Sequence, residues 1–374
     1  MLEAFPRSLS GSASEFAIPR PLRWKGKVCA LAGLSGLLLV VIVFATTLGS
    51  VHIPFSTCFQ VLLSQLPFLH IVPACPEIFG GTLNLESLET IILDTRLPRI
   101  LLAGMVGASL AVAGATYQGL FRNPLADPYL LGVAQGAGLG ATIAFLIPFT
   151  LQWMSFGAVP LFAFIGGLGA VAVVYSLARV GKTLPATTLI LAGVALGAFL
   201  ASITSYLLTT CGEELHGIVF WLLGGLSLTN WAEVGIVLPC VIVGVIVIWL
   251  HARPLNVMQL DEEQAQQLGI NVERVKLTLL AAATLITSAA VCFTGLIGFV
   301  GIIIPHAVRL VWGPDHRFLL PLSILVGAIF LILADTLAHT MFQPTEVPVG
   351  VITAFCGAPF FLYLLRRKKG LAFF

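Results

Sequence analysis

Few side chains in this chain could carry chemistry, and Asp335 and His339 are the first candidates. They stand four positions apart in an apolar stretch, so a helix there would place both on one face. Ionisable groups inside a membrane helix are candidates for ion or proton transport. An acid and a histidine at this spacing also form structural pairs, so the spacing leaves a relay and a structural role open.

Two arginines, Arg96 and Arg99, open another apolar stretch together with Pro98. Pro98 suits the first turn of a helix, where its missing N–H would have no partner anyway. The arginines could bind acidic groups on an external partner, or they could anchor the helix to lipid phosphates. The residues alone do not separate these two roles.

No catalytic or metal-binding motif occurs in the sequence. Gly181, Lys182 and Thr183 resemble the end of a phosphate-binding loop, but Ser176 stands where that loop needs its first glycine, and no strand precedes it. There is no HExxH, no nucleophile elbow, no pair of catalytic carboxylates, and no CxxC pair among the 7 cysteines. We therefore expect no catalytic residue, no metal ligand and no cofactor bound by this chain.

The composition explains why candidate residues are scarce. Of 374 residues, 58% are hydrophobic and only 10% are charged, whereas soluble domains usually carry about 25% charged residues. Only a lipid bilayer can solvate so much apolar surface. The composition predicts an all-α, polytopic membrane protein and gives no sign of nucleic-acid binding.

Apolar stretches long enough to cross a membrane, about 20 residues each, recur along the chain. We expect ten spans, of which the eighth is the shortest because Pro305, His306 and Arg309 lie inside it. The expected spans are residues 28–50, 100–121, two within 129–178, 184–212, 234–250, 277–297, 299–312, 318–338 and 347–365.

Positive charge orients these spans. All of the 19 Lys and Arg residues except Arg96 and Arg99 then fall in the two ends of the chain and in the loops of one side. Lys and Arg favour the cytoplasmic side of short loops, so both termini are expected in the cytoplasm. One missed span would reverse every later loop, and the bias itself therefore supports an even number of crossings.

This orientation divides the chain into a cytoplasmic tail (1–27), a membrane domain (28–368) and a second cytoplasmic tail (369–374). The first apolar run is too long for a signal-peptide core, so we expect it to be retained as a span. An external loop at 51–95 contains Cys58 and Cys75, which could form a disulfide in an oxidising exterior. The longest cytoplasmic loop is 251–276.

That cytoplasmic loop holds the one clearly amphipathic stretch. Asp261 can cap a short helix that Gly269 can end, and Leu260, Ala265 and Leu268 would lie broadly on one side of it. Such a helix suits a lever that docks on a soluble partner, and a solvated connector is the alternative. The residues assigned to this contact are Leu260, Asp261, Glu262, Glu263, Gln266, Leu268 and Gly269.

The segment 121–132 predicts a tight cytoplasmic turn between two spans. Pro124 and Pro128 prevent a continuous helix there, and Asn123 and Asp127 are residues that favour turns.

Several longer strings resemble the FecCD-type permeases, the membrane subunits of type II ATP-binding-cassette (ABC) importers for iron siderophores, haem and cobalamin. The resemblance covers about residues 28–368. It is carried by RLPR (96–99), QGLFRNPLADPYLLG (118–132), TLILAGVALG (188–197), FWLLGGL (220–226), QLGI (267–270), TGLIGFVGIIIPHAVRL (294–310), DHR (315–317) and EVPVGVITAFCGAPFFLYLL (346–365).

The resemblance implies a set of partners. Two permeases would form a homodimer with the transport pathway along their shared interface, in the cytoplasmic membrane of a bacterium or archaeon. Two ATP-binding subunits would bind ATP and Mg, and the segment 251–276 would act as the coupling helix seated on them. An external or periplasmic substrate-binding protein would deliver the cargo.

The resemblance also implies roles for individual residues. Asn123 and Leu125 match residues that narrow the inner end of the pathway, and Thr187 matches a second constriction. Arg96 and Arg99 match arginines that dock the binding protein. Relatives often carry a third arginine where this chain has His339, so that contact is expected to be weaker or dependent on pH.

Three classes of function compete on the sequence. An ion-coupled secondary transporter could use Asp335 and His339 as its relay, but it predicts several charges at mid-membrane depth, and almost none are present. A membrane enzyme or scaffold lacks a catalytic constellation. The sequence therefore favours ATP-coupled import, with an Fe(III)-siderophore as the first expected cargo and haem or cobalamin as the alternatives.

Overall fold

The computed structural model describes residues 24–49, 53–65, 77–78, 81–82, 84–147, 157–226, 229–342 and 345–367. Apart from turns, these residues are helical except for one small hairpin, in which β1 (Glu77–Ile78) pairs antiparallel with β2 (Gly81–Thr82). The helical fold predicted from composition is confirmed.

Each expected span coincides with a helix. Within the described residues, seven helices are long and apolar enough to cross a membrane, with α4 counted as the end of a helix that runs Leu85–Leu120. Because α5, α13 and α15 are shorter apolar helices, the number of crossings stays a prediction. The ten helices are α1 (Trp24–Thr47), α4 (Leu97–Leu120), α5 (Val133–Leu146), α6 (Ala158–Ala178), α7 (Ala186–Thr210), α9 (Trp231–Leu250), α12 (Val272–Thr294), α13 (Val300–Trp312), α14 (His316–Thr340) and α15 (Val349–Arg367).

The second helix begins earlier than its apolar run. It starts as α3 (Leu85–Glu89), continues as the π-helical η1 (Thr90–Arg96) and passes directly into α4. Pro98 has no N–H to offer the carbonyl four residues earlier, which accounts for the wider turn just before it. The region expected as an external loop is thus partly helical, and it also contains α2 (Phe55–Ser64).

Four further short helices join the longer ones. They are η2 (Pro128–Leu131), α8 (Leu215–Leu222), α10 (Ala252–Met258) and α11 (Glu262–Gln267). Of these, the residue pattern predicted only α11. All four are too short for helical periodicity to separate them from turns, and α11 was predicted from its capping residue Asp261 and its terminating residue Gly269.

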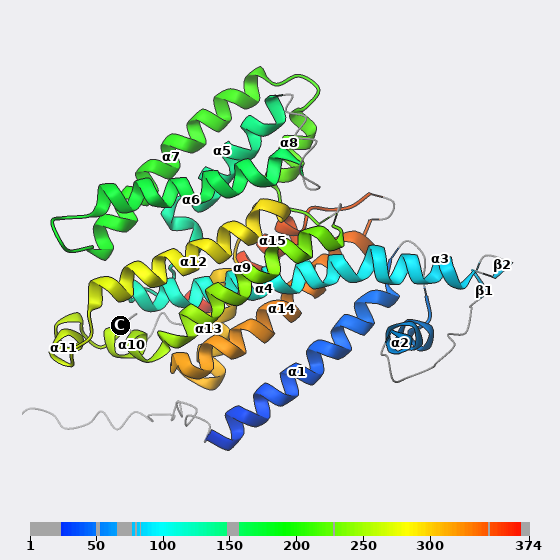
Figure 1. Ribbon diagram of the computed structural model, residues 1–374, viewed down its shortest axis with the longest axis horizontal. Helices are drawn as coiled ribbons and strands as arrows, with labels where there is room; N and C mark the ends of the chain where they lie inside the picture. The colour runs from blue at the N-terminus through cyan, green and yellow to red at the C-terminus, as the bar shows by residue number, and fades with distance from the viewer. Residues whose placement is uncertain are drawn as a thin grey trace, which may run out of the picture.

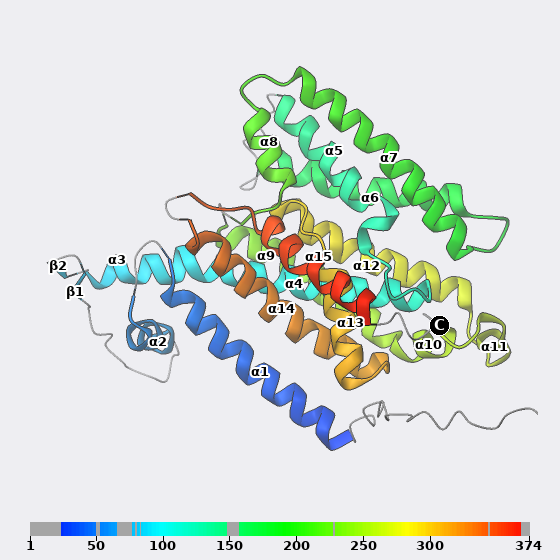
Figure 2. The same cartoon turned by 180° about the vertical axis from the view of Figure 1, so that it is seen from behind.

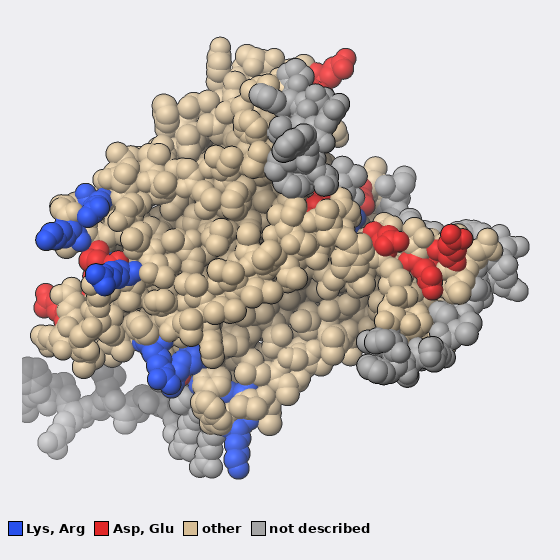
Figure 3. Space-filling model, viewed as in Figure 1, with Lys and Arg blue, Asp and Glu red and all other residues tan. Residues whose placement is uncertain are grey.

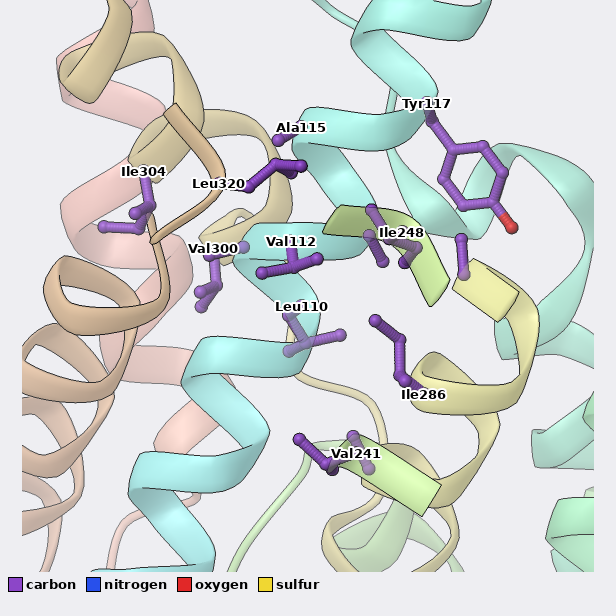
Figure 4. Close-up of a cluster of buried hydrophobic side chains, with 14 of the residues drawn as sticks. Leu110, Val112, Ala115, Tyr117, Val241, Ile248, Ile286, Val300, Ile304 and Leu320 are labelled. Atoms are coloured by element: carbon purple, nitrogen blue, oxygen red, sulfur yellow. The ribbon is translucent and has the colours of Figure 1, made fainter. Parts of the chain in front are cut away.

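Helix α4 forms the centre of the bundle and packs against α9, α12, α13 and α14. Figure 4 shows its apolar side chains meeting those of the surrounding helices. On the outside of this group, α1 lies along α14, and α5, α6, α7 and α8 form a separate layer over α12 (Figure 1).

Glycines let the helices approach closely. A Cβ on Gly107 of α4 would clash with the carbonyl oxygen of Gly327 on α14. A Cβ on Gly136 of α5 would likewise clash with the carbonyl oxygen of Gly166 on α6. Lipid offers no hydrophobic drive for helices to associate, so close van der Waals packing of this kind stabilises the bundle.

The first and last of these helices place the two ends of the described chain at the same end of the molecule. Figures 1 and 2 both place the start of α1 and the end of α15 toward the end of the molecule that carries α10 and α11. Lys and Arg gather at that same end, with some acidic side chains among them, whereas the charged side chains over α3 at the opposite end are acidic (Figure 3). This distribution supports the predicted orientation, with α10 and α11 on the cytoplasmic face.

Candidate functional site

An ion-pair cluster lies at the end of the bundle that is predicted to face outward. The Arg99 guanidinium binds both carboxylate oxygens of Asp335 at 2.9 Å, and its Nη1 donates to Glu346 Oε1 at 3.0 Å. The side chains of Arg99 and Asp335 are only 16% and 4% exposed. This cluster ties the start of α4 to the end of α14 and to the segment before α15.

The expected pairing of Asp335 with His339 is secondary to this cluster. The Nδ1 atom of His339 lies 2.8 Å from the backbone carbonyl oxygen of Asp335 and 3.9 Å from its carboxylate. The guanidinium of Arg99 is always charged and can donate two parallel hydrogen bonds to one carboxylate, which an imidazole cannot do. Glu346 was not predicted as part of this cluster, because it stands as a single charge between two apolar stretches.

All three residues expected to dock a binding protein line one outer cavity of about 400 Å³, together with Asp335 and Glu346. Arg96 also donates through Nη1 to the carbonyl oxygen of Thr46 at the end of α1, at 2.5 Å. The structure therefore brings Arg96, Arg99 and His339 together, and it gives both arginines contacts within the chain. Docking itself stays a prediction.

Cys58 is a free, buried thiol on α2 that lies 3.6 Å from the carbonyl oxygen of Thr46. The suggested disulfide with Cys75 stays a prediction, because Cys75 lies outside the described part of the chain.

At the end predicted to be cytoplasmic, the turn after α4 is built by Asn123. Its side-chain oxygen accepts from the N–H of Leu125 at 2.9 Å, and its own N–H donates to the carbonyl oxygen of Gln118 at 3.1 Å. The turn fixes Leu125 with 47% of its surface exposed. The predicted tight turn is confirmed.

Asp127 begins the next element by accepting from the N–H of Tyr129 at 2.7 Å, which caps η2. Burial raises the pKa of Asp127 to about 6, against the opposing effect of that hydrogen bond. Asp127 and Gln135 line a cavity of about 420 Å³ bounded by α5, α7 and α13. Two polar side chains, Asp127 and Gln135, therefore border this cavity between the helices.

Thr187 lies in the first turn of α7 and is exposed. Within the described residues, no hydrogen bond joins it to Asn123 or Leu125. The three expected constriction residues are therefore at one end of the molecule but do not form a closed gate in a single copy of the chain.

The expected lever helix is α11. Gly269 follows it with φ of 82°, as expected for a helix end, and Asp261 stands at its N-cap but makes no hydrogen bond there through its side chain. The expectation that Leu260, Ala265 and Leu268 share one side is wrong. The helix spans only Glu262–Gln267, so the two leucines lie outside it and point outward, 76% and 71% exposed, while Ala265 is buried.

Glu262, expected to face a partner, also makes contacts within the chain. Its carboxylate binds Lys276 Nζ at 2.6 Å and Arg122 Nη2 at 3.5 Å. Glu263, Gln266, Leu268 and Gly269 are exposed around it. The surface available to a partner at α11 therefore includes exposed polar residues of the helix and the two exposed leucines that flank it.

Known proteins resemble this chain over most of its length. Residues 37–367 match the FecCD transport family. The chain is 48% identical over 303 residues to the cobalamin import system permease protein BtuC of Halobacterium salinarum, covering 81% of this chain and 80% of that protein. It is 41% identical to the hemin transport system permease protein HmuU of Yersinia pestis, covering 74% of this chain and 83% of that protein.

A solved inward-facing structure of the metal-chelate type of ABC transporter superposes with a TM-score of 0.76 and 30% identity, covering 90% of this chain and 98% of that one. The match extends through nearly every helix described here. The protein is a multi-pass component of the cytoplasmic membrane, and it belongs to the FecCD transport family of ABC importer permeases.

Proposed function

We propose that two copies of this permease form the pathway of an importer for a bulky metal chelate. A pair of separate subunits binds ATP and Mg and hydrolyses the ATP, and an external binding protein delivers the chelate. The match of residues 37–367 to the FecCD transport family carries this proposal.

Two features of the structure support the arrangement. The exposed Leu260 and Leu268 stand beyond the ends of the spans, where lipid cannot cover them, and a groove on an ATPase subunit would bury them. The cavity that contains Asp127 and Gln135 opens beside α7. A second copy packed over this face would enclose the cavity, since polar groups left against lipid are unfavourable.

The cargo proposed for the first test is a corrinoid. The relative named for cobalamin is 48% identical to this chain, compared with 41% for the hemin permease and 40% for the iron(III) dicitrate permease FecD of Escherichia coli. The iron chelates remain the second candidate, because several relatives carry names for iron citrate.

The proposal is tested with the permease, its ATPase subunit and its binding protein reconstituted in vesicles. Uptake of cyanocobalamin, haemin and a ferric siderophore is measured with ATP, without ATP, and with a proton or sodium gradient alone. We expect ATP-dependent uptake of one ligand class. Uptake driven by a gradient without ATP would overturn the proposal and favour a secondary transporter.

A further inference from the structure

One carboxylate holds three cytoplasmic segments together. Glu262 lies in α11, and its Oε1 atom binds Arg122, which belongs to the turn after α4. Its Oε2 atom binds Lys276 in the first turns of α12 at 2.6 Å. Through these two contacts α11 is attached both to that turn and to a membrane helix.

Lys276 extends the connection to a third segment. Its Nζ donates to the carbonyl oxygen of Leu184 at 3.2 Å and to Glu273 at 3.4 Å, in addition to Glu262. An ammonium group has three N–H donors, and these three acceptors use all of them. The side chain is 5% exposed, so its position is set by these partners and not by solvent.

The two anchored backbone positions stand beside the expected constriction residues. Arg122 directly precedes Asn123, and its backbone has φ of 50°, a conformation that is uncommon for residues other than glycine. Leu184 is buried and lies in the turn that leads into α7, three positions before Thr187. A displacement of α11 would therefore pull on both places at once.

We propose that Glu262 is a positioning residue that transmits movement of α11 to the turn after α4 and to the start of α7. The proposal rests on the importer function above and assigns Glu262 a role within the chain, while the exposed leucines make the contact with the ATPase subunit. Loss of the connection would let ATP hydrolysis proceed without moving the two segments, so less substrate would cross per ATP consumed.

The test uses the complete reconstituted importer and measures two rates in the same vesicles, ATP hydrolysis and substrate uptake. Glu262→Gln and Lys276→Gln should each lower uptake per ATP roughly fivefold or more, the lower range of ordinary coupling between sites. Hydrolysis should stay close to the wild-type rate. The double variant should be no worse than Glu262→Gln alone, because loss of the Glu262 carboxylate already removes both connections of α11.

Arg274→Gln is the matched control. It removes the same charge two positions before Lys276, from an exposed side chain that takes no part in the cluster, and uptake per ATP should be unchanged. Arg122→Gln tests the same connection from its other side if the Lys276 variant fails to assemble. Arg122 is 42% exposed, so its loss costs little stability, and it should still lower uptake per ATP.

Two results would overturn the proposal: wild-type uptake per ATP in the Glu262 and Arg122 variants, or an equal loss of hydrolysis and uptake. The second result would mean that Glu262 only maintains the contact with the ATPase. Wild-type vesicles report separately on the importer function, because an absence of ATP-driven uptake there would contradict that function and not only the role of Glu262.

Discussion

Arg99 and Asp335 show how a residue suited to an external contact can also be needed inside the fold. The pair is largely buried, and both carboxylate oxygens of Asp335 are bound by one guanidinium. Removing water from two charges is costly, and the attraction between them offsets that cost only while both are present. A single substitution therefore has a larger effect than loss of the whole pair.

We predict that Arg99→Gln lowers the free energy of unfolding by about 3 kcal/mol, since it leaves Asp335 buried and unpaired. Thermal unfolding of the purified protein in detergent measures this loss. The double variant Arg99→Gln with Asp335→Asn should recover most of the stability. Equal stability of the Arg99 variant and the wild type would show that the cluster contributes nothing to folding.

At the scale of the element, α13 shows why a short helix with an internal proline is stable. Pro305 has no N–H, so the carbonyl oxygen of Gly301 lacks its usual helical donor. The Gln118 side chain of α4 donates to that oxygen at 3.3 Å and to the carbonyl oxygen of Ile302 at 3.2 Å. A side chain from a neighbouring helix thus supplies what the proline removes.

We predict that Gln118→Met destabilises the protein by about 1–3 kcal/mol, because it keeps the volume of the side chain but leaves a buried carbonyl without a donor. The same measurement in a Pro305→Ala background separates this cause from altered packing. There the backbone N–H of residue 305 can reach Gly301, so the loss should be smaller. An identical loss in both backgrounds would exclude the proposed compensation.

At the scale of the whole molecule, both ends of the described chain lie toward the face that carries α10 and α11 (Figures 1 and 2). This placement agrees with an even number of crossings. It also puts the expected ATPase contact on the side of the membrane where ATP is available.

Reporter tags fused to the two ends of the chain should therefore both react only with reagents on the cytoplasmic side. Labelling in intact and in permeabilised cells measures this, and a tag inserted beside α2 should show the opposite result. Tags at the two ends that react from opposite sides would invalidate the assignment of every loop and, with it, the importer function.

Much of this molecule could be predicted from its sequence, because the relevant signals are local. Apolar runs placed a helix at each expected span, and the turn at Asn123 followed from neighbouring prolines and turn-forming residues. The helix end at Gly269 was predicted for the same reason. Each of these features depends on residues within a few positions of one another.

The contacts between distant segments could not be predicted in this way. Arg99 and Asp335 are 236 positions apart, and helical spacing favoured His339 as the partner of Asp335. For the same reason the pairing of Glu262 with Arg122 and Lys276 was not predicted. The sequence by itself determined the helices, their order and the family, since these follow from local hydrophobicity and from matching strings. Only the tertiary structure decided which charges pair, because in a medium of low dielectric a charge pairs with whatever opposite charge packing brings nearest.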